Sequence, residues 1–245
     1  MVHGFDIALD EPEVFARALA RAEAMAEAVD VPVRVVRTDM RSRIPVRWED
    51  FHVLAVASAL LTFQDRRETG FIGSSCPYDY LAFPHGSSPV QDWMAGTGRM
   101  RIRHDGSGFN RMEKVDRIAD VPAVVNNLRV CWIGAQRDRN CGRCEKCVRT
   151  MLNFRATGRP VPRCFPQGID RHALRSVRPS GRELLEYEMI IAAALARQVR
   201  APWIPAVRRM IRRRRLELRL RDTPLAPLYR AGRRLVGQDS RGVRV

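Results

Sequence analysis

The chain has 245 residues, and 45% of them are hydrophobic, which is enough to form a sizeable core. Its formal net charge of +16 comes almost entirely from arginine, because 41 of the 43 basic residues are Arg. Residues 197–245 carry 15 arginines and three acidic residues, so only about +4 of the net charge falls on residues 1–196. The charge pattern excludes a uniformly basic globular domain and predicts a basic C-terminal segment.

The sequence shows neither a membrane span nor a secretory signal. The longest apolar runs, HVLAVASALL from His52 and MIIAAALA from Met189, are far shorter than the roughly 20 residues that cross a bilayer. The chain opens with MVHGFDIALD, which has no basic start. We therefore expect a cytoplasmic protein. In that compartment clustered cysteines are more typical of a metal or catalytic site than of disulfides.

Strand-like and helix-like patterns alternate through the first 75 residues. The hydrophobic periodicity predicts a strand over 1–9, a helix over 11–29, a strand over 31–38, a helix over 47–66 and a strand over 69–75. Such alternation is typical of parallel strands joined by helices that cover the sheet.

The next segment, residues 76–109, reads as irregular. It is rich in Pro, Gly and Ser, with aromatic residues interleaved. A loop of this length inside a compact domain is usually functional, so we expect it to determine specificity. His104 and Asp105, in RHDG, could form an acid–base pair, but the pattern favours a turn.

Further elements follow in order. The sequence predicts a helix over 110–120, with Asn110 as N-cap and Glu113 completing a capping box. It then predicts a strand over 126–132, a helix over 148–158 closed by Gly158, and helices over 181–199 and 203–221.

Four of the six cysteines fall in one stretch, CWIGAQRDRNCGRCEKC: Cys131, Cys141, Cys144 and Cys147. A CxxCxxC run with a fourth thiol nearby can place four sulfurs around one Zn²⁺, and Gly142 can adopt the left-handed turn that such a knuckle needs. An iron–sulfur cluster and unligated redox thiols are the alternatives. Four protein ligands would leave no open position for chemistry, so we expect a structural metal site. The remaining thiols, Cys76 and Cys164, read as small buried residues, with a nucleophilic Cys76 as the less favoured interpretation.

The stretch LRVCWIGAQRDRNCGRCEKCVRTM resembles the zinc-binding segment of 7-cyano-7-deazaguanine synthases and their relatives in the PP-loop ATP pyrophosphatase superfamily. Upstream, NRMEKVDRIAD resembles the helix that carries their Lys-x-Glu-[Ile/Val] motif, with Arg111 in place of the Lys and Glu113 matching the Glu. The motifs HGFDI, HDG and NCGRCEKC are closest to a poorly characterised bacterial branch. The resemblance covers roughly residues 2–165.

This resemblance implies an α/β fold of the PP-loop (HUP) type, with a Rossmann-like parallel sheet, helices on both faces and a zinc knuckle. It implies ATP and Mg²⁺ as cofactors and the adenylation of a substrate oxygen, followed by attack of ammonia or another nucleophile. The domain would span 1–165, and 166–245 would form a helical, basic C-terminal extension. The superfamily's phosphate loop, SGGxDS, occurs nowhere in the 245 residues, so we expect the first strand and that loop to be missing from this chain.

Five residues are candidates for binding the cofactor. Asp6 lies toward the end of the first predicted strand and Ser74 and Ser75 end the third, and ligands of open parallel sheets bind beyond the carboxyl ends of strands. Asp6 could equally cap the following turn. Arg111 and Lys114 are added by the resemblance. No catalytic residue can be named.

The rival interpretation is a non-catalytic, zinc-stabilised binding module. In this reading the Arg-rich segment 197–221 contacts nucleic acid or an anionic surface. A solvated segment without a partner is the simpler alternative for these arginines.

Overall fold

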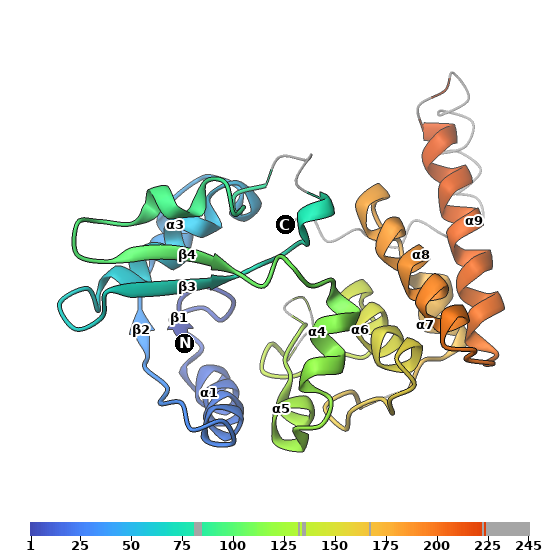
Figure 1. The fold of residues 1–245 in the computed structure, drawn as a ribbon, viewed down its shortest axis with the longest axis horizontal. Coiled ribbons are helices and arrows are strands. Elements are labelled where there is room, and N and C mark those ends of the chain that lie inside the picture. The colour runs from blue at the N-terminus through green and yellow to red at the C-terminus, as the bar shows by residue number, and fades with distance from the viewer. Residues whose placement is uncertain (81–84, 132, 134–135, 167, 222, 224–245) are drawn as a thin grey trace.

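The computed structural model describes residues 1–80, 85–131, 133, 136–166, 168–221 and 223. It is a mixed α/β chain in which the four described strands gather at one end with helices α1 and α3 (Figure 1). Helices α7, α8 and α9 gather at the opposite end, and α4, α5 and α6 lie between the two groups. This confirms the mixed α/β class with a parallel arrangement of strands. Residues 224–245, part of the predicted C-terminal extension, lie outside the described residues.

The first parallel pair joins β1 (Val2–His3) to β2 (Val36–Arg37) through α1 (Pro12–Glu27). Pro12 opens α1 in the first turn, where its missing N–H costs no hydrogen bond. Strand β1 is shorter than predicted because the chain turns at Gly4, whose φ is +107°. A Cβ at Gly4 would lie 1.7 Å from the carbonyl oxygen of Thr38, so only glycine fits this crossing.

The second parallel pair consists of β3 (Thr69–Gly73) and β4 (Arg101–Asp105), paired from Thr69↔Arg101 to Gly73↔Asp105. Its inner face, with Ile72 and Ile102, packs on α3 (Trp48–Leu61), which follows the short helix α2 (Met40–Arg43). The prediction of an irregular segment over 76–109 is therefore wrong for β4. It is also wrong for the short 3₁₀ turns η1 (Tyr78–Tyr80) and η2 (Asp92–Ala95).

The four strands do not form one sheet among the described residues. β1 pairs with β2 and β3 pairs with β4, which gives two separate two-stranded sheets. No described helix provides the cover expected on the outer face of β3–β4. Phe71 on that face is 59% exposed, and the guanidinium of Arg103 lies 5.8 Å from its ring.

Two short helices follow β4. Helix α4 (Arg111–Ile118) has the predicted capping box, since the Asn110 side chain accepts from the backbone of Glu113 and the Glu113 side chain accepts from the backbone of Asn110. Helix α5 (Pro122–Asn127) replaces the beginning of the strand predicted over 126–132. Pro122 starts this helix, and residues 128–131 extend from it without pairing to a described strand. The rest of that prediction includes Trp132, which lies outside the described residues.

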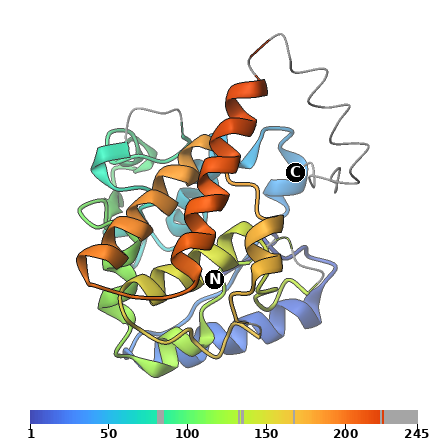
Figure 2. The same ribbon diagram turned by 90° about the vertical axis from the view of Figure 1, so that its right-hand side faces the viewer.

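The main core lies among the C-terminal helices: α6 (Glu145–Ala156), α7 (Arg171–Ser176), α8 (Gly181–Ala196) and α9 (Trp203–Arg221). Figure 2 shows α8 and α9 running side by side. Met151 of α6, Tyr187 of α8 and Val207 of α9 are fully buried in this one core. The core therefore continues across position 165, where the sequence suggested a domain boundary. No described helix combines the length and apolar character needed to span a bilayer.

Candidate functional site

The four clustered cysteines converge on one point. Their Sγ atoms all lie within 4.8 Å of one another, with Cys131 and Cys144 3.8 Å apart and Cys141 and Cys147 3.9 Å apart. A tetrahedral metal with sulfur bonds of ~2.3 Å requires sulfur–sulfur edges of roughly 3.8 Å. The described cluster thus fits a single tetrahedral metal ion and is compatible with structural zinc.

Local chain geometry brings these thiols together. Gly142 has a φ of +71°, so the chain can turn back between the first two cysteines of the knuckle, and the backbone N–H of Cys144 donates to Sγ of Cys141 at 3.3 Å. Asn140, which is buried, fixes the separate Cys131 segment. Its Oδ1 accepts from the backbone of Val130 and Cys131, and its Nδ2 donates to the carbonyl of Leu128.

Electrostatics within the cluster favour a bound cation. Hydrogen bonds from Cys144 and Cys147 lower the pKa of Cys131, whereas the interaction with Cys131 raises the pKa of Cys144 to about 12. Once one sulfur of the cluster is ionised, it opposes the ionisation of its neighbours unless a cation neutralises the charge. All four ligands come from the protein, and Cys131 and Cys147 are buried, so the cluster offers no evident position for a substrate.

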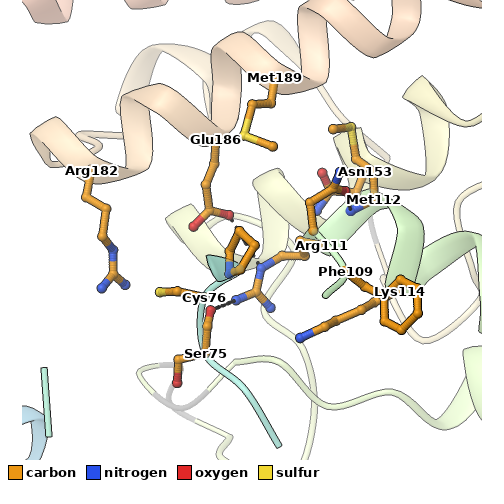
Figure 3. A pocket seen from close by; sticks show the side chains of 12 residues that line it. Ser75, Cys76, Phe109, Arg111, Met112, Lys114, Asn153, Arg182, Glu186 and Met189 are labelled. Atoms are coloured by element: carbon orange, nitrogen blue, oxygen red, sulfur yellow. Dashed lines mark hydrogen bonds and ion pairs between the residues drawn. The ribbon is translucent and has the colours of Figure 1, made fainter. Parts of the chain in front are cut away.

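A pocket lies beyond the carboxyl ends of β3 and β4, between α4, α6 and α8 (Figure 3). Its cavity volume is about 30 Å³, and roughly 10–15 Å³ on this scale holds one water molecule. The pocket thus has room for a small functional group. Its walls combine charged, amide and thiol groups with apolar side chains; the lining residues are Ser75, Cys76, Pro77, Phe109, Asn110, Arg111, Met112, Lys114, Asn153, Arg182, Glu186 and Met189.

Lys114 and Arg111 reach from α4 to the end of β3. The Lys114 ammonium donates to the Ser74 carbonyl at 3.2 Å and to the Ser74 hydroxyl. Burial lowers the pKa of Lys114, and the charge of Arg111 lowers it further. Arg111 donates to the Ser75 carbonyl at 3.4 Å and forms a 3.4 Å ion pair with Glu186 of α8. The two cations therefore lie close together at the strand end.

A buried ion cluster lies next to the pocket. Arg149 of α6 pairs with Glu145 at 2.8 Å and with Glu186 of α8. Burial raises the pKa of Glu145 to about 7, whereas Arg149 opposes that shift. The cysteine-bearing helix and the pocket wall are thus joined by charge as well as by apolar packing.

The hydrogen-bonded chain Asp92–His104–Ser107 resembles a catalytic triad in its residue types. His104 Nδ1 lies 2.6 Å from Oδ2 of Asp92, and His104 Nε2 lies 2.8 Å from Oγ of Ser107. Ser107 is 3% exposed, however, and its hydroxyl also donates to the Cys76 carbonyl at 3.0 Å. We interpret these three hydrogen-bonded side chains as a structural brace that holds the Cys76 backbone at the pocket. His104 thus pairs with Asp92, while Asp105 is exposed and precedes the turn at Gly106, whose φ is +83°.

The candidates predicted from sequence separate into two places. Ser75, Arg111 and Lys114 line the pocket, and Ser74 anchors Lys114. Asp6 lies elsewhere, at the turn after β1, where it pairs with Arg129 at 2.9 Å and Arg41 at 3.6 Å. Asp6 instead lines a separate cavity of about 380 Å³ beside β1.

The sequence does not indicate that several other residues line the pocket. Asn153, Arg182 and Glu186 lie in helices α6 and α8 and reach the pocket only through tertiary packing. The chain matches no protein-family model, and neither a curated protein nor a solved structure is significantly similar to it.

Proposed function

We propose that this chain is the α/β part of an ATP-dependent adenylating enzyme of the PP-loop ATP pyrophosphatase type, close to the 7-cyano-7-deazaguanine synthases. In such an enzyme ATP and Mg²⁺ supply the activated adenylyl group. The residues of this chain would orient the nucleotide and the acceptor at the carboxyl ends of the parallel strands. The reaction class that this proposal implies is adenylation of an acceptor oxygen, followed by attack of a nitrogen nucleophile on the carbon that bears this oxygen, with release of AMP and formation of an amide or nitrile.

The observation that carries the proposal is the division of the strands into two parallel pairs. The cavity of about 380 Å³ lies beside β1 and reaches Trp48 and Val56 of α3, the helix that packs on β3. A further parallel strand between β1 and β3 would join the two pairs into one sheet. The resemblance implies a strand followed by SGGxDS that is missing from this chain, and this position would accommodate it.

The positions of the candidate residues also support the proposal. Ser74 and Ser75 follow β3 directly, and Lys114 is held against Ser74, so a cation lies at the strand ends where the reacting ends of the nucleotide and of the acceptor would meet. Asp6 lies at the turn after β1 and accepts from Arg129. A carboxylate at that place suits a Mg²⁺ that accompanies a nucleotide.

The metal in this proposal is zinc, and its role is to hold α6 against the Cys131 segment. Cys131, Cys141, Cys144 and Cys147 would ligate it. The donor set of four thiolates is one that Zn²⁺ prefers in structural sites.

Two measurements test the proposed function. Translation of the DNA upstream of Met1 should reveal an in-frame SGGxDS motif. The polypeptide that includes this segment should bind ATP and release pyrophosphate when it is given candidate carboxylate acceptors. If the motif is present and ATP does not bind, the enzyme proposal is wrong.

A second candidate function, contact with nucleic acid, is favoured by one face of α9. Arg208, Arg212 and Arg219 lie on that face at helical spacing, are exposed and have no ion-pair partner among the described residues. A binding module of this kind would bind a single-stranded oligonucleotide with an affinity that falls as salt rises, by a slope of roughly −0.7 per phosphate contacted. Replacing the three arginines by Gln should flatten that slope. An oligonucleotide that does not bind at low salt would contradict this candidate.

A further inference from the structure

The pocket between α4, α6 and α8 has an excess of positive charge. Three cationic side chains, those of Arg111, Lys114 and Arg182, line it, and Glu186 is the carboxylate among the lining residues. Glu186 is already engaged by Arg149 and Arg111. Asp105 also acts on Lys114 electrostatically, but it does not line the pocket. The balance of charge at the pocket therefore favours an anionic ligand.

An amide donor without a hydrogen-bond partner also favours a ligand with acceptor oxygens in this pocket. Asn153 is 1% exposed and lines the pocket from α6 (Figure 3). Its Nδ2 has no hydrogen-bond partner in the part of the chain that the structure describes. Leaving a buried donor unpaired costs free energy, so a ligand with an acceptor oxygen would stabilise this position.

A thiol lies in the same pocket. Cys76 lines it next to Ser75, and in the view of Figure 3 its sulfur points toward the side of Arg182. The hydroxyl of Ser107 holds the carbonyl of Cys76, so the thiol has a fixed backbone. Burial raises the pKa of Cys76, and the positive charges of Arg182, Arg111 and Lys114 oppose that shift.

We propose that this pocket receives the carboxylate end of a small organic acid, held by Lys114 and Arg111 with the amide of Asn153 as a further donor, and that Cys76 is a reactive thiol beside the bound acid. The small cavity volume excludes a whole nucleotide from this part of the site, so the acid is distinct from ATP. Only its role as the acceptor for adenylation rests on the proposed function. The binding of the acid and the reactivity of Cys76 do not.

Iodoacetate tests the proposal directly, because it is a small carboxylate that alkylates thiols. The Cys76 thiol first loses its proton to the buffer. The thiolate then attacks the methylene carbon, so that a C–S bond forms, the C–I bond breaks and iodide leaves. Iodoacetamide is the neutral counterpart of the same size. The full zinc-loaded chain is treated with each reagent, and the modification of Cys76 is followed by peptide mass spectrometry.

In the folded chain, the rate at Cys76 should saturate with iodoacetate and rise linearly with iodoacetamide. The ratio of the iodoacetate rate to the iodoacetamide rate at Cys76 should be higher in the folded chain than in the urea-unfolded chain. Propionate, which cannot alkylate, should protect Cys76 from iodoacetate. Equal ratios in the folded and unfolded chains, or no modification of Cys76 by either reagent in the folded chain, would overturn the proposal.

Two variants test whether Lys114 causes the preference of Cys76 for iodoacetate. Lys114→Met should lower the iodoacetate rate at Cys76 about tenfold and leave the iodoacetamide rate nearly unchanged, since it removes one charge from a partly buried site. Arg103→Met, on the outer face of β4, should change neither rate. If Lys114→Met does not fold, protection of the unmodified chain by propionate still decides the question. The labelling needs no ATP, so it can fail or succeed independently of the pyrophosphate assay.

Discussion

Arg149 of α6 forms an ion pair with Glu186 of α8, which lines the pocket, and Glu186 also pairs with Arg111 of α4. Three helices are thereby connected through one carboxylate. Arg149 lies two residues after Cys147 of the thiol cluster and Glu186 lines the pocket, so the thiol cluster and the pocket share a wall. Changes in this wall should affect both.

The first prediction concerns this ion pair. Arg149→Met should lower the free energy of unfolding by roughly 3–5 kcal/mol, because it leaves Glu145 and Glu186 without their shared buried partner. Arg155→Met, on the exposed side of the same helix, should change it by no more than about 0.5 kcal/mol. Urea unfolding of the two variants measures the difference. Equal losses would contradict the role assigned to Arg149.

The second prediction concerns the metal. The purified chain should contain one zinc ion per chain by elemental analysis, and Cys147→Ser should abolish stoichiometric binding and lower the melting temperature. A strong chelator should have a similar effect on the unsubstituted chain. Cys76→Ser is the matched control, because Cys76 lies outside the thiol cluster, and it should retain the metal. Iron in place of zinc would refute the assignment of the ion.

The third prediction is a pH dependence from Cys164. Burial raises the pKa of Cys164 to about 11 from a usual value of 9.0, and its S–H donates to the Val125 carbonyl. The neutral thiol is therefore favoured in the folded chain. This stabilisation is fully present below pH 9 and is lost as the pH rises to 11. The unsubstituted chain should lose roughly 2–3 kcal/mol more stability between pH 8.5 and 11 than Cys164→Ala does. Parallel stability profiles for the two chains would rule this out.

The fourth prediction tests the brace behind Cys76. Asp92 is fully buried and accepts from the Ser87 hydroxyl, the Ser88 backbone and the His104 ring. Asp92→Ala should cost about 3 kcal/mol, since it leaves these donors unpaired.

Asp65→Ala serves as its control, because Asp65 forms an exposed ion pair with Arg99 and should contribute less than about 1 kcal/mol. Asp92→Ala should also abolish the preference of Cys76 for iodoacetate if the brace positions the thiol. A variant that is destabilised but keeps this preference would show that the brace only stabilises the fold.

Local sequence patterns predicted the elements whose signal is contained within a few residues. The periodicity over 11–29 gave α1, and Asn110 with Glu113 gave the start of α4. The thiol cluster was predictable because three of its four cysteines lie on one short segment. In each case neighbouring residues determine the geometry.

Elements that depend on distant partners were missed. Strand β4 lies in a Gly-rich segment, and its signal, Met100 and Ile102 alternating with arginines, spans only a few residues. The predicted strand over 126–132 was apolar enough for a sheet but finds no described strand beside it. Glu186 and Asn153 reach the pocket because α8 packs on α6, and no spacing in the sequence encodes that contact.

The separation of the strands into two pairs also bears on how copies of the chain behave in solution. Among the described residues, β1 and β3 each pair with a single strand, so each has backbone donors and acceptors on one side that no other described strand satisfies. Unpaired edges of this kind act as templates for intermolecular β-pairing. Phe71, exposed on the outer face of β3, adds an apolar surface next to that edge. Concentrated samples should therefore self-associate, and a short peptide that occupies the β3 edge should suppress this association.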